Sequence, residues 1–304
     1  MAGLMRERFA DVTTELLGSH DRLVLVMADL SATLFDQAKA SYPDRVLNLG
    51  IREQLMIGVT GGLSLAGMRP IAHSFAPFLV ERPFEQIKID LNHQDVGAVL
   101  VSAGASYDIA SGGRSHQSPG DVALLATLPD WTIYVPGHPD EAEAQLRAAA
   151  AGDGRVYIRL SNQANERPYG LADRSAGQGF LVLRRGTRGT VIAVGPLADA
   201  VLAATETLDV TVLYANRIRP FDGQTLRAVV SGQDAAAIVI VEPYLAGTSV
   251  SEIASALKDL PHRVLGLGVG HEEVRKYGTS RQHAIAHGLT SGRLRLSISS
   301  FLGI

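Results

Sequence analysis

The feature that most constrains this chain is a regular alternation of short apolar runs with helix-like segments. In the first half, the runs have the length and composition of strands buried in a parallel sheet, and they lie at 23–28, 45–49, 97–103, 131–135 and 155–160. Helix-like stretches lie between them, at about 51–66, 78–92, 119–128 and 139–151. Because parallel strands need crossover connections, this alternation favours an α/β fold with a mostly parallel sheet.

A polar segment with glycine and proline, residues 161–179, interrupts the alternation. The pattern then resumes, with strands expected at 190–195, 209–215, 236–242 and 263–269 and helices at 197–208, 222–231 and 248–258. A chain of 304 residues is long enough for two domains. We therefore expect two doubly wound, mostly parallel α/β domains, residues 1–165 and 180–304, joined by a linker at 166–179.

Composition excludes several classes of protein. The formal net charge of −3 provides no basic face for nucleic acid. The chain has no cysteine, so disulfides, thiol catalysis and cysteine-based metal sites are ruled out. No apolar run reaches the ~18 residues that a membrane span needs. We expect a soluble cytoplasmic protein that binds neither nucleic acid nor membrane.

Ligands of such sheets bind outside the carboxyl ends of the strands. This rule selects five places in the first domain: Asp29, Glu53, the segment 73–78, the loop 104–117 and the residues after Leu160. Position alone also offers ordinary explanations. Glu53 stands in a first helical turn, where the helix dipole favours a carboxylate, and Asp29 suits a helix cap.

Motifs for phosphate and metal sites fail in context. "AGDG" (151–154) resembles a diphosphate and magnesium motif, but a strand follows it and no asparagine stands at a suitable distance, so we interpret it as a turn. "GLGVG" (266–270) lacks the third glycine of a dinucleotide fingerprint. His283 and His287 are four residues apart, without a glutamate between them or a third ligand. We expect no metal ligand in this chain.

Several segments, in order along the chain, resemble the transketolase family of thiamine diphosphate enzymes. The likeness runs from about Arg6 to the end, and it matches first the family's pyrimidine-binding domain and then its C-terminal domain. It is carried by "GIREQ", "AGMRP", "SFAPFLVERPFEQI", "SHQS", "VYIRL", "ANRIRPFD" and "IVIVEPYLAGTSVSEIA". The diphosphate-binding domain with which full-length transketolases begin is missing. The chain therefore resembles the C-terminal subunit of a split transketolase.

The resemblance implies thiamine diphosphate as cofactor. In this family a glutamate hydrogen-bonds N1′ of the aminopyrimidine and favours the tautomer that accepts the cofactor's C2 proton, and Glu53 matches it. A buried carboxyl beside an apolar ring suits that task. Phe75 and Phe78 match the aromatic pocket around the pyrimidine, although two such rings could also be plain core residues. Asp29 matches an acidic position near the active site.

The resemblance also implies substrate-binding residues. His116 matches a catalytic, substrate-facing histidine at the carbonyl and hydroxyl end of the sugar. Arg6 matches an arginine that contacts phosphate, and Arg114 is a candidate for a substitute cation. His73, beside the pocket, is a further candidate.

Three positions depart from the family pattern on the sugar-phosphate side. Gly112 stands where the family carries an aspartate that contacts a sugar hydroxyl, and Gly104 where it carries a phosphate-facing histidine. Asn162 stands where a phosphate-binding arginine is usual. The loss of a bidentate arginine lowers phosphate affinity. We therefore expect an intact cofactor half and a substrate that differs from ordinary pentose phosphates.

The function expected from the resemblance is transfer of a two-carbon ketol unit from a ketose to an aldehyde by a two-component transketolase. The implied partner is an N-terminal subunit that carries the diphosphate and Mg²⁺ site, in an α2β2 heterotetramer with a two-fold core. Two alternatives within the enzyme class are a 1-deoxyxylulose-5-phosphate-synthase-like activity and an oxo-acid dehydrogenase β-type subunit. A third is a non-catalytic scaffolding or regulatory subunit.

Overall fold

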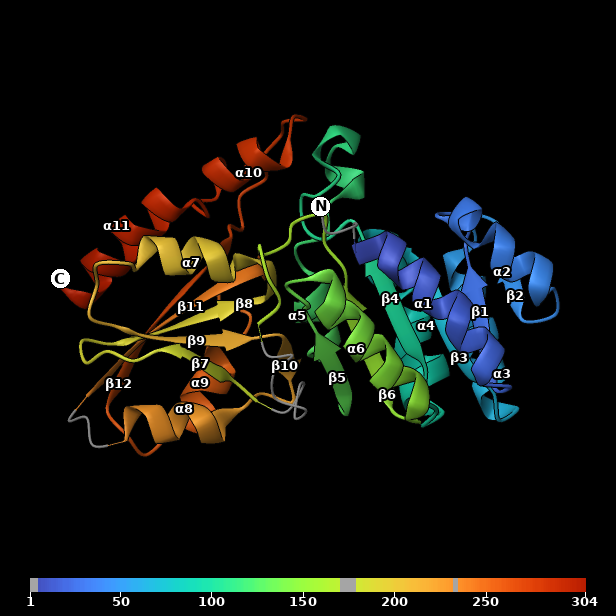
Figure 1. Cartoon of the computed structure of the whole chain (residues 1–304), viewed down its shortest axis with the longest axis horizontal. Helices are drawn as coiled ribbons and strands as arrows, with labels where there is room; N and C mark the ends of the chain where they lie inside the picture. Colours follow the sequence, from blue (N-terminus) through green and yellow to red (C-terminus); the bar gives the residue numbers. More distant parts are fainter. Residues whose placement is uncertain (1–4, 170–178, 232–234) are drawn as a thin grey trace.

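Two mostly parallel sheets lie side by side in the computed structural model, which describes residues 5–169, 179–231 and 235–304 (Figure 1). Most of the expected linker, 170–178, is therefore outside the described residues. The first sheet has the strand order β10-β5-β6-β4-β3-β1-β2. Its strands are β1 (Leu23–Met27), β2 (Val46–Asn48), β3 (Arg69–Phe75), β4 (Val99–Ala103), β5 (Trp131–Tyr134), β6 (Arg155–Arg159) and β10 (Arg217–Arg219).

The second sheet has the strand order β12-β11-β8-β9-β7. Its strands are β7 (Leu181–Arg184), β8 (Thr190–Val194), β9 (Thr211–Ala215), β11 (Ala236–Leu245) and β12 (His262–Val269). All pairs are parallel except that of β7 with β9. The first sheet is likewise parallel except where β10 pairs with β5. The predicted α/β fold class is confirmed.

Helices cover both faces of each sheet (Figure 1). On the first sheet, α1 (Met5–Ser19) and α6 (Pro139–Ala151) pack on one face, and α3 (Glu53–Leu65) and α5 (Asp121–Leu125) on the other. On the second, α7 (Ala198–Ala204) and α11 (Ser291–Leu302) lie opposite α8 (Gly223–Val230) and α9 (Val250–Ala256). The shorter helices are α2 (Asp36–Ser41), α4 (Phe84–Gln86) and α10 (Ser280–Ala286).

The expected helix over 78–92 is broken into three parts. A π-helical turn, η2 (Pro77–Glu81), precedes α4, and a second, η3 (Ile87–His93), follows it. Pro83 lies between η2 and α4. Proline has no backbone N–H to donate, so it interrupts the helical hydrogen bonds at this point. Single π turns inside helices are frequent at functional sites.

The apolar core is continuous between the two sheets. One cluster of buried side chains includes Ile133 of the first sheet and Ile192 and Leu213 of the second. Backbone hydrogen bonds also join the two halves, from Leu245 N to the carbonyl of Pro119 (2.8 Å) and from Val135 N to that of Asn216 (2.8 Å). These contacts seat the segment before Asp121 against the end of β11. No described helix is long and apolar enough to cross a membrane.

Candidate active site

The carboxyl ends of β2, β1, β3 and β4 lie at one edge of the first sheet, because these strands are parallel neighbours. Asp29 follows β1, and Glu53 opens α3 shortly after β2. Phe75 ends β3, with Phe78 in the turn after it, and the loop containing His116 follows β4. The topology thus brings five predicted positions to the same edge.

Glu53 is a buried acid with one unsatisfied oxygen. Its side chain is only 1% exposed, and its Oε2 accepts a 2.7 Å hydrogen bond from Nη1 of Arg82. Its Oε1 is also buried and has no hydrogen-bond partner in the described part of the chain. A buried carboxylate oxygen without a donor costs free energy. The site is therefore set up to receive a hydrogen-bond donor.

Arg82 links this acid to the aromatic residues. Its guanidinium lies 4.1 Å over the ring of Phe78. That ring stacks on Phe75 at a centroid distance of 6.4 Å and meets the His116 ring edge to face at 5.3 Å. Four predicted residues, Glu53, Phe75, Phe78 and His116, therefore form one connected cluster. Sequence reasoning missed Arg82, because it lies 29 residues after Glu53 and no local pattern links the two.

His116 is fixed by close packing against Gly112. A Cβ atom on Gly112 would lie 2.7 Å from Cγ of the His116 ring and 2.9 Å from its Cβ. Such distances are too short for any side chain without movement of the ring. The glycine that departs from the family pattern therefore gives His116 its present position.

A buried ion pair stabilises the loop 104–117, which contains His116. Nε of Arg159 lies 2.7 Å from Oδ2 of Asp121, and both side chains are almost fully buried. The same guanidinium donates to Oγ of Ser106 at 2.7 Å and to the carbonyl of Ser118 at 3.4 Å. Breaking such a pair leaves an uncompensated buried charge. The buried Arg159–Asp121 pair thus holds the loop in place through its hydrogen bonds to Ser106 and Ser118.

Arg114 and Asp29 lie at the rim. Nε of Arg114 donates to Oε1 of Glu273 at 3.1 Å, so the C-terminal half of the chain reaches the His116 loop. Asp29 is exposed at φ 70°, and its Oδ1 accepts a 3.3 Å hydrogen bond from Asn48. It does not cap the helix that follows, whose N-cap is Ser31. No local pattern could have predicted the contact with Glu273.

His73 and Arg6 lie apart from this cluster. The His73 ring is fully buried, with Nδ1 2.7 Å from the carbonyl of Val101 and Nε2 3.0 Å from Oγ of Ser31, and it packs on Phe9. Burial lowers the pKa of His73 to about 4, and the nearby Arg6 charge acts in the same direction. The ring is a neutral core group that presents neither nitrogen to a substrate. Nε of Arg6 is buried without a hydrogen-bond partner in the described residues.

Glu81 provides a second carboxyl near the cluster. Its Oε1 accepts a 2.8 Å hydrogen bond from Oγ of Ser118. Desolvation raises the pKa of Glu81, and the Ser118 hydrogen bond opposes this shift.

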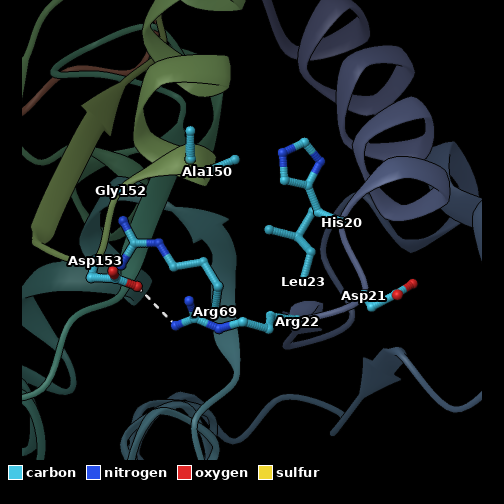
Figure 2. Close-up of a pocket in the computed structure, with 9 residues that line it drawn as sticks. His20, Asp21, Arg22, Leu23, Arg69, Ala150, Gly152 and Asp153 are labelled. Carbon is cyan, nitrogen blue, oxygen red and sulfur yellow. Dashed lines mark hydrogen bonds and ion pairs between the residues drawn. The ribbon is translucent and has the colours of Figure 1, made fainter.

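A cavity of about 270 Å³ lies at the opposite, amino-terminal edge of the first sheet (Figure 2). The guanidinium of Arg69 points into the structure there and donates to the carbonyls of Ala149 and Gly154. Arg22 pairs with Asp153 at the surface. The Arg69 guanidinium donates to backbone carbonyls at the end of α6 and in the turn after it, so its role in this cavity is to hold these elements together. We therefore do not interpret this cavity as a ligand site. The "AGDG" turn predicted at 151–154 is part of it.

Comparison with known proteins places the chain among proteins of one family. Residues 4–167 match the family model described as "Transketolase, pyrimidine binding domain". An uncharacterised 33.6 kDa protein of the fasciation locus of Rhodococcoides fascians is 52% identical over 97% of this chain and 94% of its own. The 6-deoxy-6-sulfo-D-fructose transketolase subunit SqwH of a Clostridium species is 29% identical over 77% of each chain.

A solved structure described as a split-gene transketolase, in an inactive β4 tetramer, superposes with a TM-score of 0.84. It is 28% identical, and the match covers 99% of this chain and 98% of that one. The likeness therefore extends through both sheets, and it includes the second sheet that lies beyond the matched pyrimidine-binding domain.

Proposed function

Since the chain belongs to the transketolase family, we propose that it is the C-terminal subunit of a two-component, thiamine diphosphate-dependent transketolase. The observation that carries the proposal is the buried, unpartnered Oε1 of Glu53 beside a stacked aromatic pair. A non-catalytic scaffold has no need of an unsatisfied buried acid, which only costs stability.

The residues of this chain fit the pyrimidine half of the cofactor. Glu53 offers an acceptor where a ring N–H would bind, and Phe75 with Phe78 offers an apolar wall for a flat ring. Arg82 holds the carboxylate in place through Oε2 and leaves Oε1 for the ligand. We assign Mg²⁺ and the diphosphate to the partner subunit, because the chain resembles a split-gene transketolase.

When bound, thiamine diphosphate supplies the carbanion chemistry that cleaves a ketose beside its carbonyl. The task of Glu53 is to hold a proton at the ring nitrogen and so select the tautomer that accepts the C2 proton. The task of His116, fixed on Phe78, is to hydrogen-bond the oxygen atoms of the sugar. We assign Asp29 and Arg114 to the rim of the same site.

The substrate is a ketose other than an ordinary pentose phosphate. Gly104, Gly112 and Asn162 leave the site without the phosphate and hydroxyl contacts of the family pattern, and the His116 ring packs closely against Gly112. We further propose that two copies of the chain and two partner subunits form an α2β2 heterotetramer in the cytoplasm.

The test is to purify the full chain with its N-terminal partner and to follow exchange of the cofactor C2 proton by NMR. Glu53→Gln should slow the exchange by about 10²-fold or more, as for loss of an acid–base catalyst. Glu85→Gln, at an exposed acid of α4, serves as control and should exchange at the wild-type rate. Equal rates in Glu53→Gln and wild type would refute the assignment.

A further inference from the structure

A second cavity, of about 230 Å³, lies between the two halves of the chain beside the candidate active site. One wall is formed by Glu81 and the 114–120 segment, and the other by the ends of β11 and β12 and the residues that follow β12. Gln117, in this wall, directly follows His116. The cavity therefore adjoins the cluster around Phe78 without being part of it.

Gln117 lines this cavity and has an unused hydrogen-bond donor. Its side chain is 7% exposed, and its Nε2 is buried without a hydrogen-bond partner in the described chain. Its backbone is fixed, because its carbonyl accepts a 2.8 Å hydrogen bond from Arg114. A buried amide that leaves its donors unused costs free energy. A hydrogen-bond acceptor in the cavity would remove this cost.

His287 provides a second donor. Its Nδ1 accepts a hydrogen bond from the backbone N–H of Gly270 at 3.3 Å, so a neutral ring carries its proton on Nε2. Desolvation lowers the pKa of His287, and the neighbouring His283 acts in the same direction. These effects favour the neutral ring over the opposing charge of Glu272, and the neutral ring is a donor that adds no positive charge.

The charges around the cavity favour a neutral ligand. Three carboxylates line it, those of Glu81, Glu272 and Glu273, against the single guanidinium of Arg114, which is already paired with Glu273. A phosphate would meet an excess of like charge. A hydroxyl group both donates and accepts, so it can satisfy Gln117 and a carboxylate together.

We propose that this interdomain cavity binds a neutral, hydroxyl-rich carbon chain. The volume of about 230 Å³ equals that of roughly eight water molecules, which suits a short polyol. The same chemistry has two sources: the end of the sugar substrate far from its carbonyl, or a separate small polyol. The first source rests on the function proposed above, whereas the binding site itself does not.

The test of binding uses saturation-transfer NMR on the full chain, with ribitol and ribitol 5-phosphate as probes. We expect ribitol to bind, and ribitol 5-phosphate to bind at least tenfold more weakly. Gln117→Leu should abolish ribitol binding, whereas Gln94→Leu, at an exposed glutamine, should leave it unchanged. Absence of ribitol binding, or equal binding of the phosphate, would overturn the proposal.

A second variant protects the test against misfolding of Gln117→Leu. Glu272→Gln alters a surface carboxylate at the cavity, so it should keep ribitol binding and strengthen binding of ribitol 5-phosphate severalfold. If Glu272→Gln leaves the preference between the two probes unchanged, the charge argument fails and the proposal with it.

Kinetics of the reconstituted pair separate the two sources. If the substrate's own end occupies the cavity, ribitol should compete with the ketose, and Gln117→Leu should raise KM more than it lowers kcat. If a separate polyol binds there, ribitol should bind without competing. Ribitol binding by a pair that turns over no ketose would support the site and refute the proposed function.

Discussion

Nη1 of Arg82 lies 2.7 Å from Oε2 of Glu53, in an ion pair whose acid is buried and whose base is 37% exposed. The pair leaves Oε1 of the acid free and lays the guanidinium over Phe78 at 4.1 Å. Arg82 thus fixes both the orientation of the acid and the position of the aromatic ring. It is a positioning residue for the candidate active site.

Replacing Arg82 should therefore disturb stability and rate together. Arg82→Leu leaves the buried Glu53 carboxylate without a partner, and because Arg82 is partly exposed we expect a loss of about 1–3 kcal/mol in the free energy of unfolding. Urea unfolding measures this loss, and C2 proton exchange of the reconstituted pair should slow at least tenfold. Arg82→Lys should recover part of the rate, because the charge returns without the flat guanidinium.

The matched control for Arg82 is Arg22→Leu, which breaks an exposed pair with Asp153 at the opposite edge of the sheet. Such surface pairs contribute about 0–1 kcal/mol. An Arg82→Leu protein as stable and as fast as Arg22→Leu would contradict the positioning role.

Restoring the aspartate of the family pattern should damage this chain. Gly112→Asp places a Cβ 2.7 Å from the His116 ring, so the ring must move away from Phe78. We expect kcat/KM of the reconstituted pair to fall at least tenfold with its own ketose and not to rise with pentose phosphates. Ser111→Asp, at the exposed neighbouring position, adds the same charge without this contact and should change kcat/KM less than threefold. Gain of pentose phosphate turnover by Gly112→Asp would contradict the packing argument.

Much of the fold could be predicted from sequence because its parallel strands are buried on both faces and therefore form continuous apolar runs. The antiparallel strands β7 and β10 were not predicted, since β7 has no buried residue and β10 has an arginine at each end, so neither has the pattern of a buried strand. β10 also pairs with the first sheet although it lies in the range predicted for the second domain. The domain bounds 1–165 and 180–304 therefore remain a prediction.

The candidate site could be predicted only in part. The rule that ligands bind at carboxyl ends of parallel strands selected Glu53 and the loop 104–117, because chain order determines where those ends meet. Within that loop, His116 was selected by the resemblance to the family. The pairing of Glu53 with Arg82, and of Arg114 with Glu273, depends on side-chain geometry across 29 and 159 residues of sequence. His73 was expected just beyond the carboxyl end of a strand, but it lies within β3 and its side chain packs on Phe9 of α1, which the sequence did not indicate.

Burial of His73 should make stability depend on pH. Its folded-state pKa is about 4 against an ordinary value of 6.5, so between these values the unfolded chain binds a proton that the folded chain does not. Stability is therefore lost as pH falls from 6.5 to 4, by about 1.4 kcal/mol per pH unit at most. Urea unfolding at several pH values should show a shallower slope for His73→Gln than for wild type. His93→Gln, at an exposed histidine, should keep the wild-type slope.

His283 and His287 lie one helical turn apart, but replacing each with phenylalanine should change the stability of the protein in opposite directions. Both ring nitrogens of His283 are buried without a hydrogen-bond partner in the described residues, and its ring stacks on Tyr107 at 5.9 Å. His283→Phe keeps the stacking on Tyr107 and removes the two unsatisfied ring nitrogens. We therefore expect the free energy of unfolding to rise, by at most about 1–3 kcal/mol. His287→Phe removes the ring nitrogen that accepts a hydrogen bond from the Gly270 N–H. This change should lower the free energy of unfolding by about 1 kcal/mol. Thermal unfolding of the two variants tests the pair, and a destabilised His283→Phe would show that its nitrogens do have partners.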